Sequence, residues 1–90
     1  MTPSKKSFLE QLSQIQTHEV GFMLGQLQKY PTTEELLTDF SYNLICRIME
    51  LIDGYGPEHP QYELTDATAE QVISGNLHDR CGEFLKSTNY

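Results

Sequence analysis

The residues of this chain best suited to binding a metal ion are three histidines and two cysteines: His18, His59, His78, Cys46 and Cys81. Structural zinc sites pair such ligands at short spacing, as in C-x2-4-C or H-x3-5-H. No two histidines or cysteines are spaced in that way, and only His78 and Cys81, three residues apart, are close in the sequence. We interpret both cysteines as reduced, buried core residues, His78 as a residue at the rim of the core, and the other histidines as surface residues. The sequence therefore predicts no metal site.

Patterns for catalysis or cofactor binding are also missing from the sequence. Nucleophilic catalysis needs an activated serine or cysteine beside a base, and there is no G-x-S-x-G motif. Neither phosphate-binding pattern, G-x-x-x-x-G-K-S/T or G-x-G-x-x-G, occurs. Residues 53–58 are an acidic turn sequence without the D-x-D-x-D-G ladder of a calcium loop. Abundant carboxylates are typical of a solvated surface, so we nominate no catalytic residue and expect no cofactor.

The charge of the chain limits its partners. The formal net charge is −7, from 6 Lys and Arg against 13 Asp and Glu. Residues 1–31 hold three lysines and two glutamates, a balance of +1, so residues 32–90 hold the remaining −8. Nucleic acids and anionic membrane surfaces are bound chiefly by Lys and Arg, so we expect neither as a partner. No apolar run approaches the roughly 20 residues of a membrane span, and no secretory signal is recognisable, so we expect a cytoplasmic protein.

Lys and Arg are absent between Arg47 and Arg80, an interval that is rich in acids and holds two tyrosines. Concentrated negative charge steers basic partners, and tyrosine is enriched at binding surfaces. We therefore predict that this interval binds another protein, with a basic surface favoured. The alternative is a solubilising face whose tyrosines pack on the edge of the core. The residues predicted to contact the partner are Tyr55, Glu58, Tyr62, Glu63, Asp66 and Glu70.

The strongest periodic pattern covers residues 32–54 and predicts a central helix at about residues 33–53. Thr32 and Glu35 have the spacing of a capping box, and Gly54 predicts the stop because glycine adopts the left-handed conformation that ends helices. The apolar stripe is wider than the roughly 100° that a surface helix needs, which predicts contact with two neighbouring helices or with a second subunit. The stripe includes Leu36, Leu37, Phe40, Leu44, Ile45, Ile48, Met49, Leu51 and Ile52, and the predicted polar side has Asp39, Asn43, Arg47 and Glu50.

Two helices are predicted before the central helix, at residues 3–16 and 17–29. Thr2 followed by Pro3 is a suitable start for the first, and the apolar face shifts within the second. One long helix with a bend is the alternative. The spacing of Gly21 and Gly25 allows close packing of helix backbones, here against the central helix, although a bend or a dimer seam would also account for these glycines.

The chain after the central helix is predicted to alternate between loop and helix. Prolines and a glycine predict a long internal loop at residues 55–65. A short helix is predicted at residues 66–74. A last helix at residues 77–86, with Asn76 as its N-cap, precedes residues 87–90, which we expect to fray.

These patterns predict a single all-α domain, a small bundle of four to five helices, with residues 3–29 and 77–86 on opposite flanks of the central helix. The predicted function is that of a small acidic, noncatalytic interaction or regulatory protein that binds another protein. The alternative is a structural homodimer, or a subunit of an assembly, whose wide central stripe is covered by self-association. A small enzyme or metal-binding protein is the third and least favoured class.

Overall fold

The computed structural model of the chain describes residues 1–54 and 61–88. Its elements are, in order, α1 (Pro3–Leu24), the 3-10 turn η1 (Leu27–Lys29), α2 (Thr33–Asp53), β1 (Thr65–Asp66), β2 (Gln71–Val72) and α3 (Leu77–Phe84). The prediction of a mostly helical chain is confirmed. The predicted four to five helices are wrong, because the described residues form three α-helices and a two-stranded sheet.

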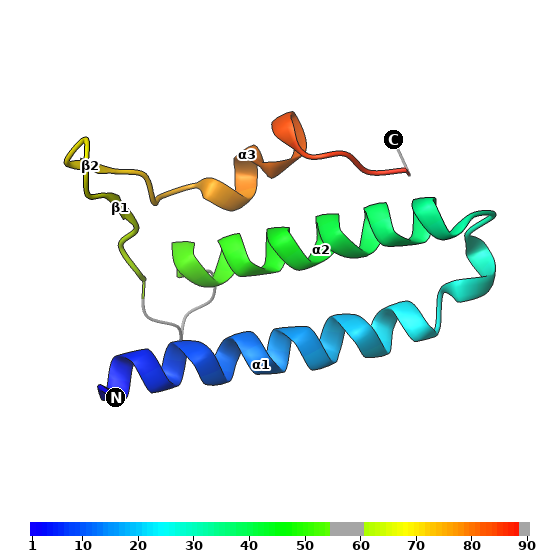
Figure 1. The fold of residues 1–90 in the computed structure, drawn as a ribbon, viewed down its shortest axis with the longest axis horizontal. Coiled ribbons are helices and arrows are strands. Elements are labelled where there is room, and N and C mark those ends of the chain that lie inside the picture. The colour runs from blue at the N-terminus through cyan, green and yellow to red at the C-terminus, as the bar shows by residue number, and fades with distance from the viewer. Residues whose placement is uncertain (55–60, 89–90) are drawn as a thin grey trace.

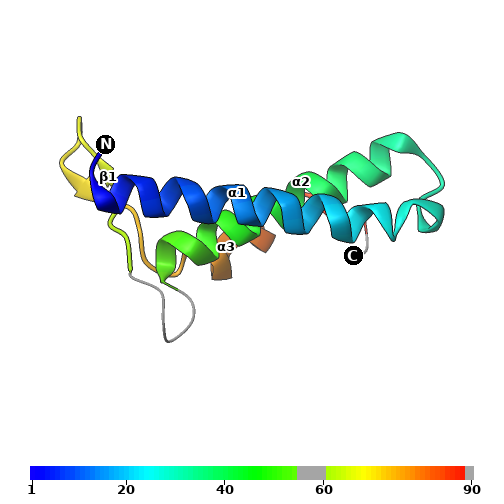
Figure 2. The same cartoon turned by 90° about the horizontal axis from the view of Figure 1, so that it is seen from below.

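The long helices α1 and α2 form an antiparallel hairpin, and α3 packs on the other flank of α2 (Figure 1). Seen from below, α2 runs behind α1 at a slant (Figure 2). The molecule is elongated, with extents of 43 × 27 × 25 Å. No helix among the described residues is long and apolar enough to cross a membrane. The central position of α2, between both flanking parts of the chain, agrees with the predicted arrangement.

The two ends of α2 are fixed by the residues predicted to fix them. At the start, Thr32 Oγ1 accepts a hydrogen bond of 3.1 Å from the backbone N–H of Glu35. At the end, Gly54 takes the left-handed conformation, with φ +74°, and its N–H donates to carbonyls of the last turn. A Cβ at Gly54 would lie 2.8 Å from the Cα of Gln61, so the chain returns there at a distance that only glycine allows. The predicted helix at residues 33–53 is confirmed.

The N-terminal part of the chain is one long helix, so the preferred prediction of two helices is wrong. α1 begins after Thr2, whose hydroxyl caps its first turn, and ends at Leu24, with Gly25 as its C-cap. The helix continues through Gly21 because an internal glycine costs only about 1 kcal/mol, whereas Glu19 and Met23 on either side of it are buried. The predicted close packing at Gly21 is also wrong, since a Cβ there would meet no atom within 4 Å.

Residues 66–74 belong to a hairpin, so the short helix predicted there is wrong. β1 and β2 pair antiparallel, with Thr65 opposite Val72. Asp66 Oδ1 accepts hydrogen bonds of 3.0 Å from the N–H groups two and three residues further on. Such local bonds offer the backbone an alternative to helical bonding. Glu70 completes the turn with φ 56°, a conformation that a right-handed helix does not contain.

Asp39 is the most deeply buried described side chain, so its predicted place on the polar side of α2 is wrong. Its exposed fraction is 2%. The carboxylate accepts hydrogen bonds from Tyr30 Oη at 2.8 Å, from Ser87 Oγ at 3.2 Å, and from the N–H and hydroxyl of Thr88 at 2.7 and 2.6 Å. Burial alone would raise the pKa of Asp39, but these hydrogen bonds outweigh burial and lower it. They tie two residues of the segment expected to fray, 87–90, to α2.

The apolar core is small for a chain of this length. Within residues 1–54 and 61–88, the buried apolar side chains are Met23, Leu51, Ile52 and Cys81. Burial of apolar surface contributes roughly 25 cal/mol per Å², so a core of this size gives limited stabilisation. Polar contacts such as those of Asp39 therefore hold a large part of the structure in place.

We predict that Gly54→Ala lowers the free energy of unfolding by about 2 kcal/mol or more, because alanine would have to adopt a left-handed backbone and its Cβ would overlap Gln61. Gly21→Ala is the matched control. Open space surrounds Gly21 inside α1, so alanine should raise the free energy of unfolding by about 0.5–1 kcal/mol. Urea unfolding followed by circular dichroism measures both variants, and equal effects would contradict the special role of Gly54.

Asp39→Ala should lower the free energy of unfolding by about 3 kcal/mol, since it removes the acceptor of four partly buried hydrogen bonds, one of them from the hydroxyl of Tyr30. Tyr30→Phe removes one of the four bonds and should cost about 1 kcal/mol. Urea unfolding measures the free energies, and amide hydrogen exchange at Thr88 should accelerate in the alanine variant. Wild-type stability of Asp39→Ala would show that these bonds do not hold the C-terminal segment.

Candidate functional site

A groove runs between α1 and α2. It consists of two adjoining hollows of about 500 and 300 Å³, which share the lining residues His18, Glu19, Arg47 and Glu50. The larger hollow also includes Gln11 and other residues toward the start of α1. We call this region the α1–α2 groove, and its shared centre is polar.

An ion pair lies at the centre of the α1–α2 groove. The Glu19 side chain is 4% exposed, and its Oε1 accepts a hydrogen bond of 3.1 Å from Arg47 Nε. Arg47 also donates to Glu50 at 3.3 Å. A buried carboxylate needs such a partner. The guanidinium of Arg47 therefore links α2 to α1 and is not available to bind another group. The sequence analysis missed Glu19, and the signal that marks it is its place between Ile15 and Met23 at four-residue spacing.

Asp53 and His78 form a second buried polar contact, between the end of α2 and the start of α3. Asp53 Oδ2 accepts a hydrogen bond of 2.9 Å from the backbone N–H of His78 and also contacts Nδ1 of its imidazole. His78 Nε2 lies 3.1 Å from Asp79 Oδ1. Asp53 therefore caps α3 from another helix. Asn76 occupies the predicted N-cap position, but it has φ 59° and its side chain makes no capping bond.

The protonation of this contact depends on its neighbours. The hydrogen bond to Asp53 is the main cause of the raised pKa of His78, Asp79 and Glu50 add to the rise, and burial opposes it. Burial would raise the pKa of Asp53, but hydrogen bonds from His78 and from the N–H of Leu77 outweigh burial and lower it. Both carboxylate contacts favour the protonated imidazole, and the contact with Asp53 orients the ring within the junction of α2 and α3. We therefore interpret the pair as structural.

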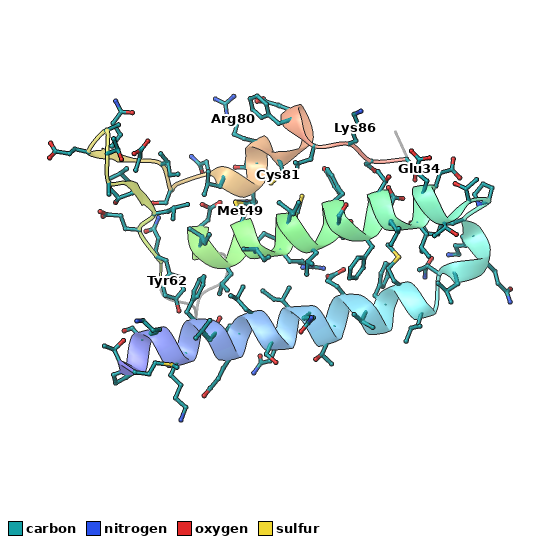
Figure 3. The ribbon with its side chains drawn as sticks, viewed as in Figure 1. Glu34, Met49, Tyr62, Arg80, Cys81 and Lys86 are labelled. Atoms are coloured by element: carbon teal, nitrogen blue, oxygen red, sulfur yellow. The ribbon has the colours of Figure 1, made fainter. Side chains whose placement is uncertain are left out.

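Cys46 of α2 and Cys81 of α3 are free thiols that interact with each other. Cys81 lies on the side of α3 that faces α2, near Met49 (Figure 3), and its thiol donates to the carbonyl of Leu77 at 3.4 Å. Burial raises the pKa of Cys81 to about 11, and the contact with Cys46 adds to the rise. Its thiol is thus protonated and unreactive at neutral pH. The predicted burial is confirmed for Cys81, whereas Cys46 is half-buried.

The described histidines lie on different elements with different surroundings. His18 lines the α1–α2 groove, and His78 contacts Asp53. His59 lies outside the described residues. In the part of the chain that the structure describes, no group of three His, Cys, Asp or Glu side chains converges on a common point suited to a metal ion.

The predicted partner-binding residues differ in their surroundings. Tyr55 and Glu58 lie outside the described residues. Tyr62 is half-buried between the start of α1 and the end of α2 (Figure 3), where its ring meets that of Phe8 edge-to-face at 4.9 Å and its N–H donates to the carbonyl of Ile52 at 2.9 Å. Tyr62 therefore anchors the chain that follows it. The predicted residues with exposed side chains are Glu63, Asp66 and Glu70.

We call residues 61–74 the acidic hairpin. The N–H of Leu64 donates to Ser74 Oγ at 3.1 Å, and its carbonyl accepts from the N–H of Ile73 at 2.8 Å, so the base of the hairpin is closed. Leu64, Val72 and Ile73 are exposed beside the carboxylates. The sequence analysis assigned Val72 and Ile73 to a helix and missed them as surface residues. The signal that marks them is β-branching, which is typical of strands.

We predict that stability declines above pH 6.5 because of His78. Its raised pKa means that its contribution is fully present below the unfolded value of 6.5 and is lost as the pH rises through the folded value. Asp53 has the opposite sign, with a contribution present above pH 3.8 and lost as the pH falls through its lowered pKa. Urea unfolding across this pH range should show that His78→Gln removes the upper decline and that His18→Gln, on exposed α1 surface, retains it. A decline that persists in His78→Gln would assign it to another group.

Comparison with protein-family models, with curated proteins and with solved structures finds no match to this chain. No relative's active site or binding mode can therefore be transferred to its residues. Its own surfaces, and above all the acidic hairpin, are the features from which a function has to follow.

Proposed function

We propose that this chain is a noncatalytic interaction protein that binds another protein through the acidic hairpin. Exposed aliphatic side chains are unfavourable in water unless a partner covers them, whereas a merely solubilising surface needs only the charges. The partner that fits is a protein with basic groups around an apolar patch. The observation that supports this proposal is the mixture of carboxylates and aliphatic groups on the exposed hairpin: Glu63, Asp66, Glu70, Leu64, Val72 and Ile73.

The acidic hairpin has a fixed base on the helices. Tyr62 packs on Phe8 of α1 and is hydrogen-bonded to the end of α2. The hydrogen bonds of Leu64 close the hairpin, and those of Asp66 hold its turn. A surface that is already ordered loses less conformational entropy on binding. The hairpin is therefore a suitable binding element in spite of its small size.

Charge supports a basic partner. No Lys or Arg occurs between Arg47 and Arg80, so the carboxylates of the acidic hairpin have no basic neighbour within their own segment. The net charge of −7 adds a long-range attraction for positive surfaces. Such charges act mainly on the rate of association, which salt then reduces.

A subunit role is the second candidate function. It is favoured by apolar side chains of α1 and α2 that are exposed in the single chain, such as Leu24 and Leu37. For either role we propose a cytoplasmic location, since two free cysteines fit a reducing compartment.

The test of the acidic hairpin begins with affinity capture from the native host and identification of the partner by mass spectrometry. The purified partner is then bound to the Glu63→Gln/Asp66→Asn/Glu70→Gln variant, in which asparagine keeps an oxygen to accept the hydrogen bonds of the turn. We predict an association rate about 10-fold lower and a flatter salt dependence, measured by surface plasmon resonance. Folding stability should change little, because exposed charges contribute little to it.

The matched control neutralises three exposed carboxylates elsewhere: Glu10→Gln, Asp79→Asn and Glu83→Gln. It changes the net charge by the same amount and should keep most of the association rate. The acidic hairpin is not the binding surface if its neutralised variant retains the wild-type rate and salt response, or if the control loses as much as that variant.

A further inference from the structure

A second exposed surface lies on the hairpin of α1 and α2, on the side away from the α1–α2 groove. Helical hairpins normally bury such a surface against another layer of structure. Contiguous exposed apolar patches mark interaction sites. The surface, which we call the apolar face, has five apolar side chains that are 37–64% exposed: Leu9, Val20, Leu24, Leu37 and Ile45.

Helical geometry places these five side chains on one side of the hairpin. The three in α1 follow one stripe, about half a turn around the helix from His18, which lines the groove. The two in α2 are eight residues apart and lie about half a turn around the helix from Glu50, which also lines the groove. Because the groove-lining residues of both helices face one side, both apolar stripes face the other.

The middle of the apolar face has no charged residue on a chain that is otherwise strongly acidic. The positions between its apolar side chains are Ser13 and Gln16 in α1 and Ser41 in α2. The nearest charges lie toward its two ends: Lys6, whose Nζ is 3.9 Å from Glu10 Oε1, near the start of α1, and Glu34 near the start of α2. A second copy can therefore approach this face without the repulsion that the acidic surfaces would cause. The proposed two-fold axis lies in the face and runs across the helices, which brings the Lys6 end of one copy over the end that holds Glu34 of the partner subunit.

The chain also exposes more surface than a compact monomer. Its accessible surface of 6909 Å² is about 1,500 Å² larger than the roughly 5,400 Å² expected for 10.3 kDa. Its radius of gyration, 14.9 Å, exceeds the roughly 12 Å of a compact domain of this length. A stable interface removes about 800 Å² from each partner. The surplus surface is enough for one such interface.

We propose that two copies of this chain pack through the apolar face, so that α1 and α2 of both copies form a four-helix core around a two-fold axis. Each copy then buries the same five side chains, as a two-fold interface requires. Four antiparallel helices are a stable arrangement for two helical hairpins. The α1–α2 groove stays outside the interface because it lies on the other side of the hairpin.

Sedimentation equilibrium of the full chain, at about 10–300 micromolar, tests this interface. The wild-type chain should sediment at about twice 10.3 kDa. Leu24→Glu/Leu37→Glu buries charges in the interface and should raise the dissociation constant at least about 100-fold. Both residues are more than half exposed in the single chain, so this variant should fold, which circular dichroism checks. Phe84→Glu, at an 83% exposed residue outside the apolar face, is the control and should stay dimeric.

A monomeric wild-type chain at the highest concentration overturns the proposal, and so does a Leu24→Glu/Leu37→Glu variant that dimerises as tightly as the wild type. Charge exchange tests the two-fold arrangement without altering apolar residues. Lys6→Glu and Glu34→Lys should each raise the dissociation constant about threefold, the size of effect typical of an exposed ion pair. The double variant exchanges the two charges and should restore the wild-type dissociation constant. A double variant no tighter than the single variants shows that the two-fold pairing is wrong.

Discussion

Burial of the Asp39 carboxylate is the constraint on which the C-terminal part of the structure depends. A buried carboxylate is unfavourable unless it is hydrogen-bonded, and its donors come from segments on both sides of α2 in the sequence, at Tyr30, Ser87 and Thr88. Hydrogen bonds are directional, so they fix these segments in one position, which the few buried apolar side chains do not. Asp53 has the same effect at the other end of α2, where it caps α3.

Docking through polar contacts explains which surfaces stay exposed. α3 contributes one buried apolar side chain, Cys81, so its attachment covers little of the apolar stripe of α2. α1 covers a second side of α2, where Glu19 meets Arg47. Apolar side chains on the remaining side of the hairpin stay in contact with solvent. The acidic hairpin is held at its base by Tyr62, while its strands project into solvent (Figure 1).

Sequence patterns predicted the features that depend on neighbouring residues. Thr32 and Gly54 give the bounds of α2 because capping and helix termination involve residues within one turn. Asp39 was misassigned because the pattern of polar residues in α2 cannot reveal that a donor 49 residues away, Thr88, would bind its carboxylate. The capping of α3 by Asp53, 25 residues before His78, was missed for the same reason, and a local candidate, Asn76, was preferred.

The candidate site shows the same limit. Charge alone indicates that Glu63, Asp66 and Glu70 are exposed, and their role in binding stays a prediction. Val72 and Ile73 are surface residues because residues 66–74 form a hairpin and not a helix. The hydrogen bonds of Asp66 in the turn favour the hairpin. A pattern of apolar residues indicates which side chains could be buried. It does not indicate whether another part of the chain packs against them.

The acidic hairpin and the apolar face differ in how their interactions respond to ions. At physiological salt, charges separated by more than about 8 Å are largely screened, so salt weakens the attraction of the acidic hairpin for a basic partner. Burial of the apolar face does not depend on charge, and salt reduces the repulsion between two chains that each carry −7. We therefore expect added salt to have opposite effects on the two proposed associations. The two proposed associations use different residues, so neutralising the acidic hairpin and charging the apolar face should affect them independently.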